Sequence, residues 1–379
     1  MSEQLVIFFR DFTIFFGIHL IVALSLNLEY GYAGVPNFGK VLAVAGGAFT
    51  VGFLPGRIIA TLFGLGSGLD YIEDNSVIVT EVNSLLVENP AISMTLLFVT
   101  LIAAGCVGAV LGLIASYPAI RLREDYLSIT LLAMGEAIQI IGYNFRPIIK
   151  GNIGVFVPDP LRWAGDQRYI LIIFIILGIG LLVLYYLERV AHSPLGRMLK
   201  AIRENEDVAE SLGKQVTRTR MKTIILASGI GAVAGALDAF IAGGVISTSY
   251  QRVIWTFWPW VMVVLGGPGN NLGVILGTFV FITLRRVIDF YKHQFALFIP
   301  FSVVWLHSLL IGVILILILM FRPEGLIKEK STTTINLGRF PQLPRSQDQQ
   351  RTLKTVIRRI LRRIRAFFIS AYSTDTNTS

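Results

Sequence analysis

The sequence is short of charged residues. Only 15% of its 379 residues are Asp, Glu, Lys or Arg, whereas 54% are hydrophobic, and its mean hydropathy is +0.68. A soluble globular chain is usually nearer a quarter charged, so this chain has too little polar surface to cover a core in water. That excludes an ordinary water-soluble enzyme and a disordered chain. The single cysteine, Cys106, cannot form an internal disulfide, which excludes a disulfide-stapled secreted domain.

Motifs for catalysis are missing as well. The sequence contains no G-x-x-x-x-G-K-[ST] phosphate loop, so it predicts no nucleotide hydrolysis by that device. Its four histidines are scattered without metal-ligand spacing, and no G-x-S-x-G nucleophile elbow occurs. We therefore expect no catalytic residue, no metal site, no cofactor and no enzymatic activity in this chain.

Positive charge is concentrated at the C-terminal end. Residues 1–321 carry 21 Lys or Arg and 20 Asp or Glu, a net +1, whereas residues 322–379 carry 12 and 4, a net +8. Nothing that looks folded accompanies this charge, which disfavours nucleic acid as a partner. The distribution favours a tail that lies beside a membrane.

Long apolar runs are abundant. A helix needs about 20 mostly apolar residues to cross the hydrocarbon core. Runs of about that size lie at 12–28, 39–63, 91–116, 126–143, 169–187, 223–243 and 300–321, and less distinct runs lie at 253–265 and 271–288. The runs are continuous instead of alternating, which excludes a closed β-barrel. The sequence predicts an all-α, polytopic transmembrane helix bundle with 8–9 spans and broken helices.

Loop charges predict the orientation of these spans. Residues 66–90 contain five acidic residues and no Lys or Arg, which suits the outside of the cell. Residues 188–222 contain eight Lys or Arg, which suits the cytoplasm. Three spans separate the two loops, and this odd number agrees with both assignments. We expect a multi-pass plasma-membrane protein with its N-terminus outside and its C-terminus in the cytoplasm.

The C-terminal end divides into two segments. Residues 331–350 are rich in polar residues and proline and read as a linker. Residues 351–379 form a basic tail. Within it, the apolar residues of 351–368 recur at helical spacing, and basic residues occupy the remaining face of the predicted helix. Such a helix is expected to lie on an anionic lipid surface. A disordered tail, or one that docks on a partner, is the alternative.

Two glycine-rich interruptions divide apolar sequence, GYAGVPNFG at 31–39 and LGGPGNNLG at 265–273. Irregular backbone at membrane depth is tolerated only where protein or a water-filled cavity satisfies it. Paired interruptions in a transporter indicate the substrate path. For 31–39 a broken helix is the favoured interpretation. For 265–273 a simple turn between helices explains the sequence equally well.

Ionisable residues within the predicted spans are candidates for function, because burying them in lipid is costly. Asp238 follows the small residues Gly231 and Gly235 in a helix that should lie inside the bundle, and we favour a pairing role for it there. Glu136 and Gln139 share one helix face, where lining of a path and interhelical hydrogen bonding are both open. His307 is best explained as a bundle histidine.

The most specific segment is the basic loop at 193–222, SPLGRMLKAIRENEDVAESLGKQVTRTRMK. Pro194 can open a helix with a short apolar stripe, and Gly213 can end a second helix. The pattern predicts a pair of short helices on the cytoplasmic face, suited to a groove on a partner protein.

This loop resembles the coupling loop of ABC-transporter permeases, whose pattern is E-A-A-x-x-x-G. Asp207, Val208, Ala209 and Gly213 occupy the pattern's positions, with Asp for Glu and Val for the first Ala. The wider string SPLGRMLKAIRENEDVAESLG is similar to the branched-chain amino acid permease family. GYAGVPNFGK, YPAIRLREDYLSITLLAMGEAI at 117–138 and VMVVLGGPGNNLGVILG at 261–277 resemble that family too.

The resemblance implies a permease domain over 1–330, with a coupling loop at 189–222, in an ATP-driven importer. Such a permease pairs with a second permease, with ABC ATPase subunits on separate chains, and with an extracellular solute-binding protein. Members carry branched-chain amino acids, other amino acids, or urea and short amides. The family often has TGG where this chain has KGNIG at 150–154, which leaves the solute open.

The resemblance also suggests roles for individual residues. The expected coupling residues are Arg197 and Arg203 as charged contacts to the ATPase, Asp207 as the pattern acid, and Ala209 and Gly213. The expected translocation-path residues are Asn27, Gly31, Gly34, Glu136 and Gln139. The alternative is an ion-coupled secondary transporter, in which Glu136 and Asp238 would be ion sites.

Overall fold

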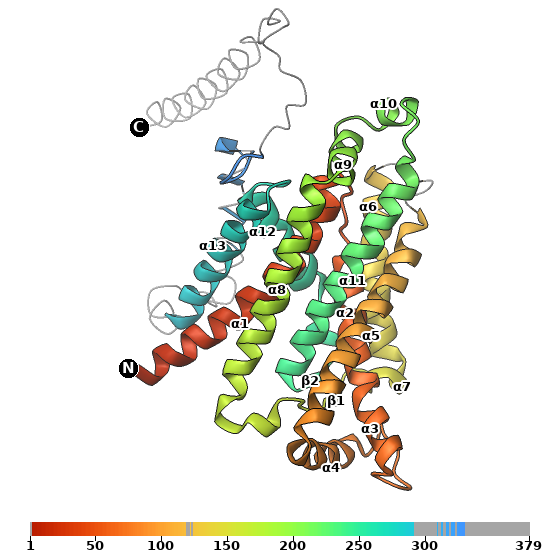
Figure 1. Ribbon diagram of the computed structural model, residues 1–379, viewed down its shortest axis with the longest axis vertical. Helices are drawn as coiled ribbons and strands as arrows, with labels where there is room; N and C mark the ends of the chain where they lie inside the picture. Colours follow the sequence, from red (N-terminus) through yellow and green to blue (C-terminus); the bar gives the residue numbers. More distant parts are fainter. Residues whose placement is uncertain are drawn as a thin grey trace, which may run out of the picture. The chain divides into compact units, whose positions relative to one another are not determined.

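A computed structural model describes residues 2–118, 122, 124–291 and 324–329, with scattered residues between 309 and 322. This part of the chain is mostly helical, in agreement with the predicted all-α bundle (Figure 1). The predicted span at 300–321 lies almost wholly outside the described residues. The predicted linker at 331–350 and basic tail at 351–379, with its lipid-binding stretch 351–368, lie outside them too.

Seven helical segments in the described part are long and apolar enough to cross a membrane. They match seven of the predicted runs. They are α1 (Ser2–Leu26) continued by the π-helical η1 (Asn27–Tyr32), α2 (Lys40–Phe53) continued by α3 (Pro55–Phe63), α5 (Pro90–Ser116), α6 (Glu124–Asn144), α8 (Arg168–His192) after the 3-10 helix η3 (Arg162–Gln167), α11 (Val216–Ala242) and α13 (Asn271–Phe290).

The run at 253–265 does not form a helix of membrane length. It consists of the π-helical η5 (Val253–Phe257) and α12 (Trp258–Gly266), which together are shorter than the roughly 20 residues that a crossing needs. Gly267, with φ of +109°, ends α12, and α13 begins four residues later and packs back against it. The interruption at 265–273 is therefore a turn between helices, and the count of eight or nine spans is not confirmed.

The interruption at 31–39 also connects two helices. The chain leaves η1 at Tyr32, turns through Gly34 with φ of +70°, and enters α2 at Lys40. Because α1–η1 and α2–α3 are each long enough to cross the membrane, the break joins two spans and does not divide one. Within the membrane-length segments, the regular α-helix is interrupted at η1, which includes Gly31, at Leu54 between α2 and α3, and at Gly165 before α8.

The acidic and basic loops lie at opposite ends of the bundle, as their charges suggested (Figure 1). One end carries α3, α4 (Asn75–Glu88), α7 (Arg146–Ile149) and the short strands β1 (Val155–Phe156) and β2 (Gly244–Val245), followed by η4 (Ser247–Ser249). The strands pair antiparallel, with Val155 opposite Val245. The other end carries α9 (Pro194–Glu204) and α10 (Glu206–Ser211).

The centre of the bundle is a close contact of α2 and α5 with α11, built on glycines. A Cβ atom added at Gly47 of α2 would overlap the carbonyl oxygen of Ala232 on α11. One added at Gly235 of α11 would overlap the carbonyl oxygen of Val44, and Gly108 of α5 lies against Ala232. Small residues let helix backbones approach this closely. The expectation that α11 lies inside the bundle is thus confirmed.

We expect the substitution Gly47→Ala to lower the free energy of unfolding by about 1–3 kcal/mol, because the new methyl group forces α2 away from α11. The matched control is Gly178→Ala in α8, where an added Cβ meets nothing within 4 Å. That change is expected to leave stability unchanged or to raise it by up to about 1 kcal/mol. Reversible unfolding of the two variants in detergent measures the difference, and equal stabilities would contradict it.

Candidate functional site

Helices α9 and α10 lie where the sequence predicted a pair of short helices. Ser193 caps α9, where its Oγ accepts a 3.3 Å hydrogen bond from the Gly196 amide, and Pro194 occupies the first turn. Asn205 ends α9 and caps α10, with its Oδ1 accepting a 3.0 Å hydrogen bond from the Val208 amide. Local capping chemistry therefore sets the boundaries of both helices.

The pair is fastened to the start of α11 by a small apolar cluster and one ion pair. Ile202, Ala209 and Val216 are buried together, with Met198 against them. Beside the cluster, Glu206 Oε2 lies 2.7 Å from Nη1 of Arg220, which is 5% exposed. An apolar contact and an ion pair therefore attach α10 to α11.

Gly213 closes the pair with a Schellman turn. Its amide donates a 2.8 Å hydrogen bond to the Glu210 carbonyl, and the Lys214 amide donates one of 3.1 Å to the Ala209 carbonyl. Its φ of +74° lies in the left-handed region, which costs an L-residue about 1–2 kcal/mol. A glycine is therefore the residue that fits this position.

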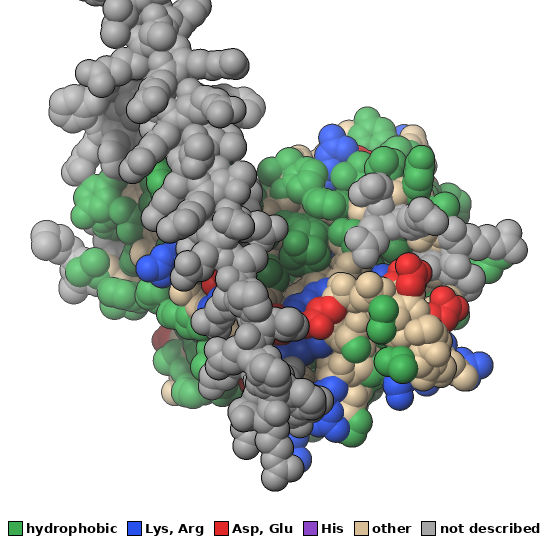
Figure 2. All heavy atoms as spheres, turned by 90° about the horizontal axis from the view of Figure 1, so that it is seen from above, with side chains coloured by type: hydrophobic (Ala, Val, Ile, Leu, Met, Phe, Trp, Pro, Cys, Tyr) green, Lys and Arg blue, Asp and Glu red, His purple; other side chains and the backbone are tan. Residues whose placement is uncertain are grey.

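The outer side of α10 presents an apolar pair to its surroundings. Val208 is 53% exposed and Leu212 is 72% exposed, one helical turn apart. Arg197 and Asp207 are exposed near them. Figure 2 looks onto this end of the bundle and shows Lys and Arg side chains spread over it, with acidic side chains beside them. A surface of this kind suits a groove with an apolar floor and charged edges.

Arg203 points into the protein, unlike Arg197. Its Nη1 donates a hydrogen bond to the carbonyl oxygen of Gly31, and its Nη2 lies 2.6 Å from Glu329 Oε2. Lys200 Nζ lies 2.9 Å from the other oxygen of the same carboxylate. Two cations of α9 thus hold one acid that is 126 residues from Arg203 in the sequence.

The segment 324–329 is attached to the turn between α12 and α13. The Leu326 amide donates a 2.9 Å hydrogen bond to the Leu265 carbonyl, and the Ile327 amide donates one of 3.0 Å to the Gly266 carbonyl. Through Glu329 this segment joins that turn to α9. The sequence does not predict the contact of Glu329 with α9, because nothing in the local pattern around Glu329 distinguishes it from the basic tail that follows.

The five residues expected along a translocation path fall into two separate groups. Asn27 lies with the α12–α13 turn, where its Oδ1 accepts a 2.9 Å hydrogen bond from the Gly269 amide and its Nδ2 donates one of 3.0 Å to Asn271 Oδ1. Gly31 packs against Asn27, and Gly34 packs against Arg203. At this end of the bundle, which carries α9, Asn27 and Gly31 are buried and Gly34 is half-buried.

The second group lies toward the end that carries β2. Glu136 Oε1 is 3.1 Å from Arg252 Nη1, and the Gln139 carbonyl accepts a 2.8 Å hydrogen bond from Ser247 Oγ. Both residues are half-buried and bonded to the chain that follows α11. Asp238 accepts a 3.2 Å hydrogen bond from the Tyr250 hydroxyl, which is the pairing role that the sequence favoured.

A buried ion pair next to the first group was not singled out from the sequence. Lys40 Nζ lies 3.1 Å from Glu29 Oε2, and both side chains are completely buried. Asn37 donates a second hydrogen bond to the same oxygen, and Lys40 donates one to the Ala227 carbonyl on α11. The signal that could have found it is a Lys directly after GYAGVPNFG, flanked by apolar sequence on both sides.

Comparison with known proteins decides the family. Residues 8–319 match the family model for the branched-chain amino acid transport system permease component. The chain belongs to this family. The permease is therefore a multi-pass membrane component of a transport system, and the resemblance found in the sequence is confirmed.

Individual relatives agree. The permease is 42% identical over 325 residues to the probable branched-chain amino acid transport permease protein LivM of Methanocaldococcus jannaschii, covering 85% of this chain and 93% of that protein. It is 25% identical to the high-affinity branched-chain amino acid transport system permease protein LivM of Salmonella typhimurium, over 82% of this chain and 68% of that protein. It is also 25% identical to the probable branched-chain amino acid transport permease protein LivH of M. jannaschii, over 72% of this chain and 77% of that protein. No solved structure matches the chain significantly.

Proposed function

We propose that the permease is a transmembrane subunit of an ATP-driven importer that translocates branched-chain amino acids delivered by an extracellular binding protein. The observation that carries the proposal is the α9–α10 pair, which presents Val208 and Leu212 outward and is fastened inward to α11. The names of its relatives support the solute class. Two of those relatives, LivM and LivH, come from one organism, which supports a second permease as partner.

In the proposed mechanism, separate ABC ATPase subunits bind the outer side of α10. Coupling requires that the ATPases bind two conformations of the permease unequally. A displacement of α10 would pass to α11 through Ala209 and the Glu206–Arg220 ion pair. It would pass to the segment at 27–34 through Arg203 and Gly31. In this account Arg197 and Asp207 contact the ATPase, whereas Arg203 transmits the movement inside the permease.

The path itself is proposed to run between the two groups of polar residues. Asn27, Gly31 and Gly34 lie at the α9 end, where they would move with Arg203. Glu136 and Gln139 lie toward the opposite end. In the proposed orientation the α9 end and the C-terminus face the cytoplasm, and the acidic loop at 66–90 faces the extracellular binding protein. The basic stretch 351–368 would then lie on the anionic inner leaflet.

The proposal is tested by the substitution Leu212→Asp, which places a charge in the apolar contact without disturbing the fold, since Leu212 is 72% exposed. We expect co-purification of ATPase subunits from native membranes to fall at least tenfold, because an unpaired carboxylate is costly to bury at an interface. Uptake of leucine, isoleucine and valine should fall with it. The control for co-purification is Val77→Asp in α4, an equally polar change at an exposed residue of the opposite end. The control for uptake is Leu212→Met, which keeps the contact apolar, because α4 lies in the loop that faces the binding protein.

If no ATPase accompanies the unaltered permease, the ion-coupled carrier becomes the better explanation, and uptake should then collapse with the ion gradient. If Leu212→Asp and Val77→Asp behave alike, α10 is not the coupling surface. Uptake of urea in place of the three amino acids would change the proposed solute, but it would not contradict the proposed coupling role of α10.

A further inference from the structure

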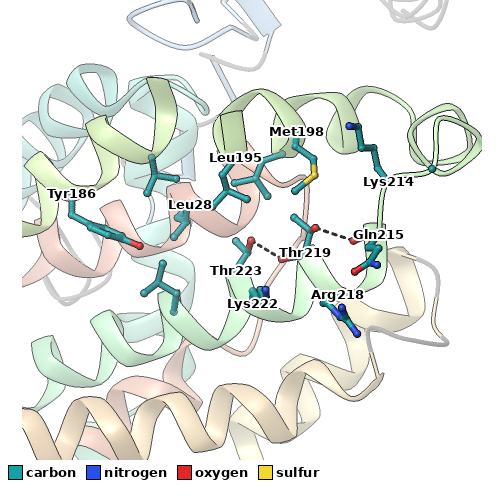
Figure 3. Close-up of a pocket in the computed structure, with 14 residues that line it drawn as sticks. Leu28, Tyr186, Leu195, Met198, Lys214, Gln215, Arg218, Thr219, Lys222 and Thr223 are labelled. Carbon is teal, nitrogen blue, oxygen red and sulfur yellow. Dashed lines mark hydrogen bonds between the residues drawn. The ribbon is translucent and has the colours of Figure 1, made fainter. Parts of the chain in front are cut away.

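A cavity of about 580 Å³ lies between α8, α9 and α11, at the end of the bundle that carries the basic loop (Figure 3). The last turns of α8 form one wall, α9 forms the roof, and the first turns of α11 form the opposite wall. None of the functional groups discussed above needs this cavity. Its lining residues are Leu28, Tyr186, Val190, Leu195, Met198, Leu199, Gly213, Lys214, Gln215, Arg218, Thr219, Lys222, Thr223 and Leu226.

The lining combines an apolar wall with a row of cations. Side chains of Leu28, Val190 and Leu226 supply the apolar part. Arg218 and Lys222 are one turn apart on α11, and Lys214 lies just before the helix begins at Val216. Figure 3 shows Thr219 and Thr223 on the same turns of α11, with hydrogen bonds to Gln215 and Thr219 respectively.

The three cations are exposed, and no ion pair involves any of them among the residues that the structure describes. Other cations of the same loop differ in this respect, because Lys200 and Arg203 pair with Glu329. Three unneutralised cations at the rim of one cavity create a site of positive potential for an anion.

The cavity lies where a lipid headgroup would lie. Tyr186 and Val190 are near the end of the membrane-length α8, and Lys222 and Leu226 are within the first turns of the membrane-length α11. The outer face of α8 next to it is apolar and exposed, with Leu181 at 65% and Leu182 at 68%. The cations therefore lie at the end of two membrane-length helices, and the exposed apolar surface lies toward the middle of α8.

We propose that this cavity binds one molecule of anionic phospholipid. The phosphate would lie against Arg218 and Lys222, and one acyl chain would lie along Leu28, Val190 and Leu226. Basic pockets between membrane helices are suited to anionic headgroups, because the phosphate meets several cations at once. A free anion would leave the apolar wall uncovered, and the chain's own stretch 351–368 carries positive charge, which these cations repel.

The test uses the complete transporter, purified in mild detergent with its partner chains. Native mass spectrometry measures retention of phosphatidylglycerol against phosphatidylcholine, and the dependence of melting temperature on added lipid gives relative affinity. The double variant Arg218→Gln, Lys222→Gln removes two cations of the cavity. The double variant Arg189→Gln, Lys328→Gln is its charge-matched control, since both residues are exposed at the same end and neither lines the cavity.

We expect the cavity variant to bind phosphatidylglycerol about 30-fold more weakly, with no change in the control. A separate variant, Leu226→Trp, fills the apolar wall at constant charge and should also release the lipid. The proposal is overturned if both double variants lose lipid equally, since the effect is then one of general surface charge. Equal retention of phosphatidylcholine, or stabilisation by inorganic phosphate alone, would overturn it too. So would a protein partner that covers the cavity in the complete transporter.

Discussion

Replacing Lys40 with methionine is expected to lower the free energy of unfolding by about 3–5 kcal/mol. The substitution leaves the carboxylate of Glu29 completely buried without its cation, and removing one partner of a buried ion pair costs this much. The Ala227 carbonyl on α11 also loses a hydrogen-bond donor. Reversible unfolding in mixed micelles measures the loss, together with the amount of protein recovered from membranes.

Two further variants make this expectation specific to the buried pair. Combining Lys40→Met with Glu29→Gln removes both charges and should recover most of the lost stability, because no uncompensated charge stays buried. Lys150→Met breaks an ion pair with Glu73, whose side chain is 62% exposed, and should cost about 1 kcal/mol or less. If Lys40→Met cost no more than Lys150→Met, the Glu29–Lys40 pair would not be a structural link between η1 and α2.

The substitution Arg203→Gln is expected to loosen the attachment of the segment 324–329 to α9. It removes the charged contact with Glu329, worth about 1.5 kcal/mol, whereas Lys200 still pairs with the same carboxylate. The amides of Leu326 and Ile327 should therefore exchange with solvent about 10-fold faster, because local opening becomes easier by that free energy. Hydrogen–deuterium exchange on the complete transporter measures this rate.

Uptake provides the second measurement for Arg203. If Arg203 transmits movement inside the permease, Arg203→Gln should lower uptake while the ATPases still co-purify. The control Arg197→Gln removes a cation that has no such internal contact, and it should leave exchange at Leu326 and Ile327 unchanged. Unchanged exchange in Arg203→Gln would mean that the backbone hydrogen bonds to Leu265 and Gly266, together with the Lys200–Glu329 ion pair, hold the segment without Arg203.

Much of the fold was predictable from the sequence, because the signals are local. Continuous apolar runs identified seven of the membrane-length helices. Pro194 marked the start of α9 and Gly213 the end of α10, since helix starts and left-handed turns depend on the residues at those positions. The run at 253–265 was wrongly predicted as a span, because its apolar stretch is nearly as long as one. Composition alone does not show that Gly267 turns the chain back so early.

The candidate site was predictable only in outline. The α9–α10 pair followed from its pattern, but the direction of Arg203 did not, because its partner Glu329 is 126 residues away in the sequence. The division of the path residues into two groups could not be predicted for the same reason. Asn27 is held by Asn271, and Glu136 is held by Arg252, each through a contact between distant segments. Long-range contacts of this kind leave no periodic trace in the sequence.

The glycine contact at the centre of the bundle has an evolutionary consequence. At Gly47 and Gly235 the facing atoms are carbonyl oxygens of the neighbouring helix, which cannot rotate out of the way as a side chain can. On the exposed faces of α5 and α8, the exchange of one apolar residue for another should cost little, because no neighbouring helix in the described part of the chain packs against them. The range of residues that each position tolerates therefore differs between the exposed helix faces and the α2–α11 contact. We expect divergent descendants to vary freely where lipid surrounds them, and to keep the smallest residues where α2 meets α11.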